Sequence, residues 1–233
     1  STAAMLVHPD FFKVAVSSAG NHDNTVYNSW WSETHHGVKE EIDADGKINY
    51  KYMIDKNQTL ANNLKGKILL ATGDVDNNVH PSGTIRMVNA FIKANKRFDF
   101  MLFPGSRHGF SDREYWFWRK ADYFYSVGKY EEALFFYNKA MEGTTTYSTG
   151  ETKQNEDNHQ FNYGKARTLR RLNRFEEAIE CYDKIIIRFH THSNFWHADV
   201  GKGDSIAALG RFDEAKKCYK DALKAPGYAH YKI

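Results

Sequence analysis

The chain is predicted to be α/β over residues 1–120 and all-α over residues 121–233. In the first part, three short apolar runs with an amphipathic segment between two of them indicate a parallel sheet with helices. In the second part, three mutually similar segments indicate tandem pairs of helices. At 233 residues the chain has room for one large domain or two small ones.

The composition narrows the classes of partner that we expect. The hydrophobic fraction is 41%, the charged fraction is 26%, and the net charge of +3 is spread along the chain, so we expect no nucleic-acid partner. No run of about 18 apolar residues occurs, so we expect no transmembrane helix and no membrane partner. No phosphate-binding loop, dinucleotide fingerprint or paired-cysteine site is present, and we expect no cofactor.

The first part reads as three strands with intervening helices. The strands are expected at Val14–Ser17, Ile68–Thr72 and Phe98–Phe103, each bounded by polar or glycine-containing turns. Residues 83–96 carry apolar side chains at three- and four-residue steps, as an amphipathic helix does, and Thr2–Leu6 resembles the end of another helix. A parallel sheet of only three strands leaves an exposed edge, through which the chain could self-associate.

Two polar residues follow neighbouring predicted strands. Asp76 comes just after Ile68–Thr72, and His108 comes just after Phe98–Phe103. Ligands of open α/β sheets bind beyond the carboxyl ends of the strands, so the carboxylate and the imidazole could meet there. A carboxylate in contact with an imidazole fixes its tautomer and stabilises its protonated form. The alternative is that Asp76 caps the following segment and His108 is an ordinary loop histidine.

Three stretches, residues 8–20, 73–80 and 103–110, resemble the prolyl oligopeptidase and dipeptidyl-peptidase IV family of serine peptidases. The resemblance runs from residue 1 to about residue 124 and implies part of an α/β-hydrolase fold and peptide-bond hydrolysis. It implies that Asp76 and His108 are the aspartate and the histidine of a catalytic triad. It further implies that Asn78 helps to hold the substrate backbone, and that Tyr27, Trp31 and Val79 line the pocket for the residue before the scissile bond.

The serine of such a triad sits in a Gly-x-Ser-x-Gly turn, which does not occur in the 233 residues. By the resemblance, the chain begins at the helix that follows this turn, so Ser1 lies past the nucleophile. We read the N-terminus as the edge of a longer gene product or of a cloned fragment. We therefore expect these residues alone to be inactive, and expect a peptide substrate only if an upstream fragment supplies the serine.

The second part contains the similar segments 128–140, 173–185 and 210–222. Each has an aromatic residue, two acidic residues, an alanine, and a tyrosine four positions after the alanine. The pattern resembles the tetratricopeptide repeat, a pair of helices in about 34 residues. The first helix of the first repeat is expected at about Arg113–Val127, where the peptidase resemblance ends. The peptidase and repeat patterns therefore join within this helix.

The repeat pattern implies specific packing. We expect the alanines to let the two helices of a unit approach, the first aromatics to fill the gap at the turn, and the tyrosines to pack between units. We also expect a left-handed residue at the end of each first helix. The alanines are Ala133, Ala178 and Ala215, the first aromatics Tyr130, Phe175 and Phe212, the tyrosines Tyr137, Tyr182 and Tyr219, and the left-handed residues Gly128, Asn173 and Gly210. The polar segment 143–158 is expected to be a mobile loop.

The cysteines and histidines of this part add little chemistry. Cys181 and Cys218 occupy equivalent repeat positions, about one repeat apart, so we expect free thiols and favour a reducing cytoplasm. His190, His192 and His197 do not have the spacing of a zinc site, and we expect no metal.

Stacked helical repeats form a concave surface that binds peptides or proteins. The candidate binding residues are Tyr163, Lys165, Arg170, Trp196, Asp199 and Lys202. The alternative for several of them is that they pack between units. Two further hypotheses stay open: that the chain is a non-catalytic interaction module, and that it is an artificial or mis-assembled fusion.

Overall fold

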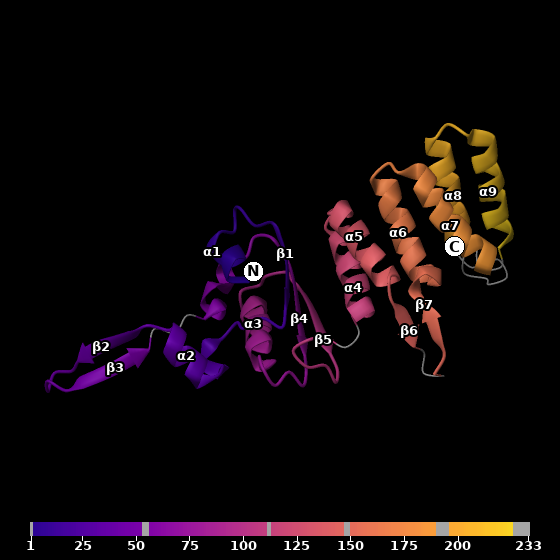
Figure 1. The fold of residues 1–233 in the computed structure, drawn as a ribbon. Helices are drawn as coiled ribbons and strands as arrows, with labels where there is room; N and C mark the ends of the chain where they lie inside the picture. Colours follow the sequence, from indigo (N-terminus) through magenta and orange to yellow (C-terminus); the bar gives the residue numbers. More distant parts are fainter. Residues whose placement is uncertain (1, 53–55, 111–112, 147–149, 190–195, 226–233) are drawn as a thin grey trace. The chain divides into compact units, whose positions relative to one another are not determined.

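The computed structural model of the chain describes residues 2–52, 56–110, 113–146, 150–189 and 196–225 (Figure 1). The chain divides into two compact units, residues 1–111 and residues 112–233. We expected the limit at residue 120. The division falls earlier because the helix that begins at Arg113 packs within the second unit.

The first unit contains a three-stranded sheet, helices and a separate hairpin. Its elements are α1 (Thr2–Val7), β1 (Val14–Ser18), η1 (Asn24–Val26), α2 (Ser29–His35), β2 (Val38–Ile42), β3 (Ile48–Tyr52), η2 (Asn57–Asn63), β4 (Lys67–Gly73), α3 (Ser82–Lys93) and β5 (Asp99–Phe103). The three predicted strands correspond to β1, β4 and β5, and the predicted helices correspond to α1 and α3.

The sheet has the order β1-β4-β5, and both strand pairs are parallel (Figure 1). In the register, Val16 lies opposite Leu69, and Ala71 lies opposite Met101. The prediction of a parallel α/β sheet is therefore confirmed. All of β4 except Lys67 is buried, as expected for a central strand. The strands β1 and β5 form the two edges, and self-association through an edge stays a prediction.

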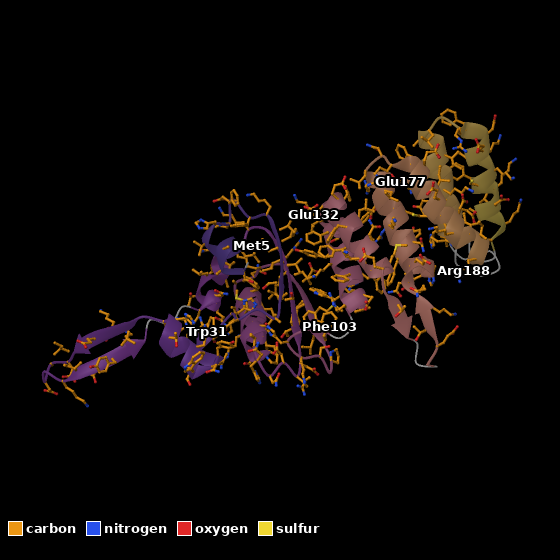
Figure 2. All side chains as sticks on the ribbon, in the orientation of Figure 1. Met5, Trp31, Phe103, Glu132, Glu177 and Arg188 are labelled. Atoms are coloured by element: carbon orange, nitrogen blue, oxygen red, sulfur yellow. The ribbon has the colours of Figure 1, made fainter. Side chains whose placement is uncertain are left out.

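The core of the first unit is formed by β4 together with α1, η2 and α3. Met5, labelled in Figure 2, packs with Leu70 and Phe91, and all three side chains are fully buried. Burying such side chains is the main stabilising contribution available to a unit of this size. The core therefore holds β4 in place, and the pairing of Gly73 with Phe103 aligns the carboxyl ends of β4 and β5.

A hairpin formed by β2 and β3 was not predicted. Its strands are antiparallel, with Ile42 opposite Ile48, and β2 is exposed along its whole length. The turn is closed by Asp43, whose side chain accepts the backbone N–H groups of Asp45 and Lys47. The sequence of β3 alternates apolar and polar residues, but β2 has three charged residues in succession, and Val38, Ile42, Ile48 and Tyr50 are all exposed, so no pattern indicated a buried face.

The second unit consists mainly of three successive pairs of helices (Figure 1). Its elements are α4 (Arg113–Ser126), α5 (Tyr130–Met141), β6 (Thr144–Thr146), β7 (Thr152–Gln154), η3 (Asn155–Asp157), α6 (His159–Arg171), α7 (Phe175–Phe189), α8 (Trp196–Ala208) and α9 (Phe212–Lys224). The pairs are α4–α5, α6–α7 and α8–α9, which confirms the predicted helical repeat array. No helix in the described ranges is long and apolar enough to cross a membrane.

The packing expected from the repeat pattern is largely confirmed. The three repeat alanines are buried, and the residues that end the first helices have positive φ angles, 78° at Gly128, 59° at Asn173 and 78° at Gly210. The Tyr137 ring packs against Gly164 of the next unit, where an added Cβ would come within 2.3 Å of it. Such a close approach is possible only for glycine.

Two expectations for the second unit are wrong. Phe212 does not fill a gap at the turn, because its side chain is 70% exposed and no described residue covers it. The segment 143–158 is not an unstructured loop, because it contains the β6–β7 hairpin and η3. The buried Asn155 side chain donates a hydrogen bond of 2.8 Å to the Ala140 carbonyl, which ties the segment to α5.

Candidate functional site

The loops that follow β4 and β5 are joined to each other. A Cβ added at Gly73, the last residue of β4, would lie 2.1 Å from the carbonyl oxygen of Ser106. This contact leaves room only for glycine and lets the two loops touch. The backbone N–H of Val75 donates to the Ser106 carbonyl at 3.3 Å, and the Gly105 N–H donates to Asp74 Oδ1 at 2.6 Å. These contacts hold the two loops together, so the side chains that the loops carry lie close to each other.

Asp76 and His108 meet at this junction. The distance between Asp76 Oδ2 and His108 Nδ1 is 3.0 Å. The other carboxylate oxygen of Asp76 accepts the backbone N–H groups of Asn78 and Val79, both at 2.9 Å. The Asp76 side chain is fully buried, whereas the His108 side chain is 47% exposed. The carboxylate is therefore fixed and the imidazole remains accessible.

This arrangement determines what the imidazole can do. A carboxylate accepts the proton of Nδ1–H, so the proton of neutral His108 is on Nδ1 and Nε2 carries the lone pair. Nε2 can then take a proton from a nucleophile, and Asp76 can stabilise the imidazolium that forms. The pair has the geometry of the base and its orienting carboxylate in an acyl-transfer site.

Of the other predicted substrate-side residues, Asn78 and Val79 contact Asp76, and Tyr27 and Trp31 are connected to it through Asn78. The Tyr27 hydroxyl donates to Asn78 Oδ1 at 3.4 Å, and the rings of Tyr27 and Trp31 meet edge to face at 6.2 Å between centroids. Trp31, labelled in Figure 2, is 43% exposed, and Val79 is buried beside Asp76. Asn78 links the aromatic pair to the Asp76 loop. Their roles in binding a substrate stay predictions.

A buried histidine near the end of β1 was missed by the sequence analysis. His22 is 3% exposed, its Nδ1 accepts from the Asn57 side chain at 3.3 Å, and its buried Nε2 has no hydrogen-bond partner among the residues that the structure describes. Burial lowers the pKa of His22 from its ordinary 6.5 to about 4. The neighbouring Asp23 is also buried and pairs with Arg86 at 2.8 Å. No sequence motif marks His22 or Asp23. Both residues are distinguished by the groups packed around them, and these are known only once the chain is folded.

The predicted binding residues of the second unit are divided between different surroundings. Tyr163 lines a cavity formed mainly by α4, α6 and α8, the first helices of the three pairs, which we call the inner helices. Arg170 donates to Asp204 at 2.6 Å, and Lys202 donates to Asp183 of the outer helix α7 at 2.5 Å. The remaining three residues are partly buried: Lys165, Trp196 and Asp199. Arg170 and Lys202 therefore form ion pairs inside the array, and a ligand role for the six residues stays a prediction.

The cavity has a volume of about 260 Å³ and lies among α4, α6 and α8, with one residue from α7. Asp122 and Arg167, which line it, were missed. They occupy equivalent positions in the first helices of two units, each 11 residues before the repeat alanine (133 − 122 and 178 − 167). Aligning the first helices as well as the second ones would have identified both residues as an inner pair.

The possible metal ligands give no site in the part of the chain that the structure describes. No group of three or more His, Cys, Asp or Glu side chains there could hold a metal ion. His190 and His192 lie outside the described residues. Cys181 is buried and Cys218 partly buried, both are free, and burial raises the pKa of each thiol.

Comparisons with solved structures give two kinds of neighbour. One is a putative dipeptidyl aminopeptidase IV from Bacteroides ovatus, 25% identical over 46% of this chain and 14% of that chain, with a TM-score of 0.37. Another is dipeptidyl peptidase 4 of Porphyromonas gingivalis, 22% identical over 54% of this chain and 18% of that chain, with a TM-score of 0.41. The chain thus spans less than a fifth of the length of these peptidases.

The second kind is a repeat protein. The second tetratricopeptide domain of Spaghetti (RPAP3), solved with an HSP90 peptide, is 20% identical over 48% of this chain and 91% of that chain, with a TM-score of 0.40. A search of curated proteins finds no match.

Family models match both parts of the chain. The tetratricopeptide repeat model matches residues 159–186 and 201–226, which correspond to the second and third helix pairs. The prolyl oligopeptidase family model matches residues 1–129, more than half of the chain. The chain therefore belongs to the prolyl oligopeptidase family and carries tetratricopeptide repeats after the peptidase segment.

Proposed function

We propose that the first unit supplies the histidine and the aspartate of a serine peptidase site. The observation that carries this proposal is the 3.0 Å contact between His108 Nδ1 and the fully buried Asp76 carboxylate. His108 acts as general base toward a serine and then as general acid toward the leaving amine. Asp76 holds the tautomer and stabilises the imidazolium.

The substrate is a peptide, bound beside the pair. Asn78 contributes an amide that can hydrogen-bond the peptide backbone, next to the Tyr27 hydroxyl. Tyr27, Trp31 and Val79 supply the apolar wall for the side chain before the scissile bond. The edge-to-face contact of the two aromatic rings fixes their orientation, which favours one shape of side chain over others.

The serine of this site comes from polypeptide outside the 233 residues, since no Gly-x-Ser-x-Gly turn occurs within them. These residues alone are therefore expected not to hydrolyse peptides. The test is labelling by a serine-directed fluorophosphonate, with a dipeptidyl reporter, on the chain alone and after adding a family polypeptide that bears the turn.

Labelling that needs both the added polypeptide and His108 supports the proposal. The variant is His108→Ala, and the matched control is His80→Ala, an exposed histidine bonded to Ser82 in the same unit. Labelling of the chain alone that is lost in His108→Ala contradicts the external serine. Restored labelling that is equally strong in His108→Ala contradicts the role of His108.

A second function is favoured by a separate observation. The inner helices α4, α6 and α8 of the repeats enclose a cavity, as expected for a surface that takes a side chain of a bound peptide. In this function the repeats bind an extended peptide and need no catalysis. Selection of a random displayed peptide library on the whole chain tests it. Enrichment of a shared sequence supports peptide binding, and no enrichment over several rounds contradicts it.

A further inference from the structure

The cavity on the inner helices has a composition that restricts its ligand. Its walls include Trp118 of α4, Tyr163 of α6 and His197 of α8. Trp118 also packs against Phe161 at 5.5 Å between ring centroids, and Tyr163 lies 6.4 Å from the His197 ring. Three rings from three different helices thus surround a space of about 260 Å³. Ring walls of this kind favour flat or large apolar groups.

The charged groups of the cavity neutralise each other. Arg167 donates to Asp122 at 2.8 Å, and the Tyr137 hydroxyl donates to the same carboxylate oxygen. The guanidinium also lies over the Tyr125 ring at 4.3 Å. Arg167 is therefore fixed in place, and its charge is balanced by Asp122 before any ligand arrives.

The polar groups that remain are uncharged at neutral pH or are hydrogen-bond donors. Burial lowers the pKa of both His159 and His197, which line the cavity, below the ordinary 6.5, so both imidazoles are neutral at pH 7. The Nε of Arg167 is buried and has no acceptor among the described residues. The Arg167 side chain as a whole is 33% exposed and lines the cavity, so its accessible guanidinium N–H groups can donate to a ligand acceptor such as a carbonyl oxygen.

We propose that this cavity binds an uncharged aromatic side chain of an extended peptide, with a neutral carbonyl of that peptide accepting from Arg167. The proposal rests on the peptide binding proposed above and specifies its ligand. An acidic side chain would compete with Asp122 for the guanidinium and would lose its hydration without a free cation to replace it. A lysine would lose its hydration at a site whose lining carboxylate, Asp122, is already paired with Arg167.

The experiment uses the whole chain and three fluorescein-labelled peptides, Gly-Gly-X-Gly-Gly with an amidated C-terminus, in which X is Trp, Glu or Lys. Fluorescence anisotropy gives each dissociation constant. The Trp peptide is expected to bind at least about tenfold more tightly than the other two. His197→Ala is expected to weaken it at least about fivefold, since this exposed residue contributes a wall of the cavity and its loss costs little stability.

A matched control distinguishes the cavity from other surfaces. Phe135→Ala removes a 55% exposed aromatic ring of α5 that does not line the cavity, and it should leave binding unchanged. Equal or tighter binding of the Glu or Lys peptide overturns the inference, and so does Trp binding that ignores His197→Ala. If none of the three binds, the inference is overturned as well, whereas the peptide library decides separately whether the repeats bind peptides at all.

Discussion

The buried His22 makes the stability of the first unit depend on pH. Its pKa is lowered by burial from 6.5 to about 4. In the unfolded chain the imidazole takes up a proton as the pH falls below 6.5, whereas in the folded unit it stays neutral until about pH 4. The folded state is therefore at full stability above pH 6.5, and this stability is lost as the pH falls toward 4.

The magnitude follows from linkage. A difference of one pKa unit corresponds to about 1.4 kcal/mol, so complete titration removes about 3 kcal/mol from the free energy of unfolding, and about 2 kcal/mol of this is lost between about pH 7.5 and about pH 5. The hydrogen bond of His22 also indicates that protonation destabilises the folded state. Nδ1 of His22 accepts a hydrogen bond from the Asn57 amide, and protonation would turn this acceptor into a donor.

The variant that tests this is His22→Gln, which keeps an acceptor for Asn57 but does not titrate. Urea unfolding of the whole chain at the two pH values gives the pH-dependent loss for each protein, and the transition that the variant shifts belongs to the first unit. The wild-type loss should exceed the variant loss by about 2 kcal/mol. His80→Gln, at an exposed histidine of the same unit, should behave as the wild type.

Equal pH-dependent losses in the wild type and His22→Gln would refute the reasoning, because burial would then not have lowered the pKa. A direct reading is available from the imidazole resonances of the chain by NMR. The signal that disappears in His22→Gln should titrate near pH 4 and not near 6.5.

Three substitutions test the packing. Gly73→Ala should destabilise the first unit by about 1–3 kcal/mol and shift the His108 ring resonances, because the added Cβ meets the Ser106 carbonyl. The control Gly109→Ala, with open space at its Cβ, should have neither effect. Equal melting temperatures for Gly73→Ala and the wild type would contradict the close approach. Gly201→Ala should destabilise the second unit by a similar amount through the Tyr182 ring, measured by thermal unfolding, and no change would mean that the ring moves freely. Phe91→Ala should destabilise the first unit by about 3–5 kcal/mol in urea unfolding, and a loss under about 1 kcal/mol would show that Phe91 is not in a packed core.

The sheet of the first unit could be predicted because its strands are short apolar runs between turns. Asp76 and His108 could be predicted as a pair because parallel strands place the loops after them at one edge. Gly73 could not be identified, since the reason for a glycine there is the Ser106 carbonyl, which lies 33 positions away in the sequence (106 − 73). The β2–β3 hairpin was missed because its apolar face, which includes Ile42, stays exposed.

In the second unit, periodicity within one repeat predicts which side chains are buried, and Ala133 and Tyr137 are examples. It also predicts that the tyrosines pack between repeats, but it does not predict whether a further element covers the aromatic residue at the turn. The prediction that Phe212 fills the gap at the turn was wrong for this reason, because an aromatic side chain there is covered only if a neighbouring element lies over it. His22 is a similar case in the first unit, because its lowered pKa depends on the groups packed around it.

The helix α4 lies within the peptidase match and also forms part of the helical array. It lies inside the prolyl oligopeptidase match, which ends at residue 129, yet it packs against α5 as the first helix of a repeat. Its Asp122 accepts the hydroxyl of Tyr137, and in the third pair Asp204 accepts the hydroxyl of Tyr219 at 3.0 Å. In both pairs the aspartate lies 15 residues before the tyrosine.

If two families were joined at random, there would be no reason for the aspartate–tyrosine hydrogen bond of the third pair to occur in the first pair as well. The repeat model matches only the second and third helix pairs, and three pairs are the practical minimum for a stable array. The helix of the peptidase segment thus completes the array and also supplies Trp118 and Asp122 to the cavity. These contacts favour a junction fitted to the repeats over an arbitrary one. Asp122→Asn should therefore destabilise the α4–α5 pair and also weaken binding of the Trp peptide to the cavity. Thermal unfolding measures the first effect, and fluorescence anisotropy measures the second.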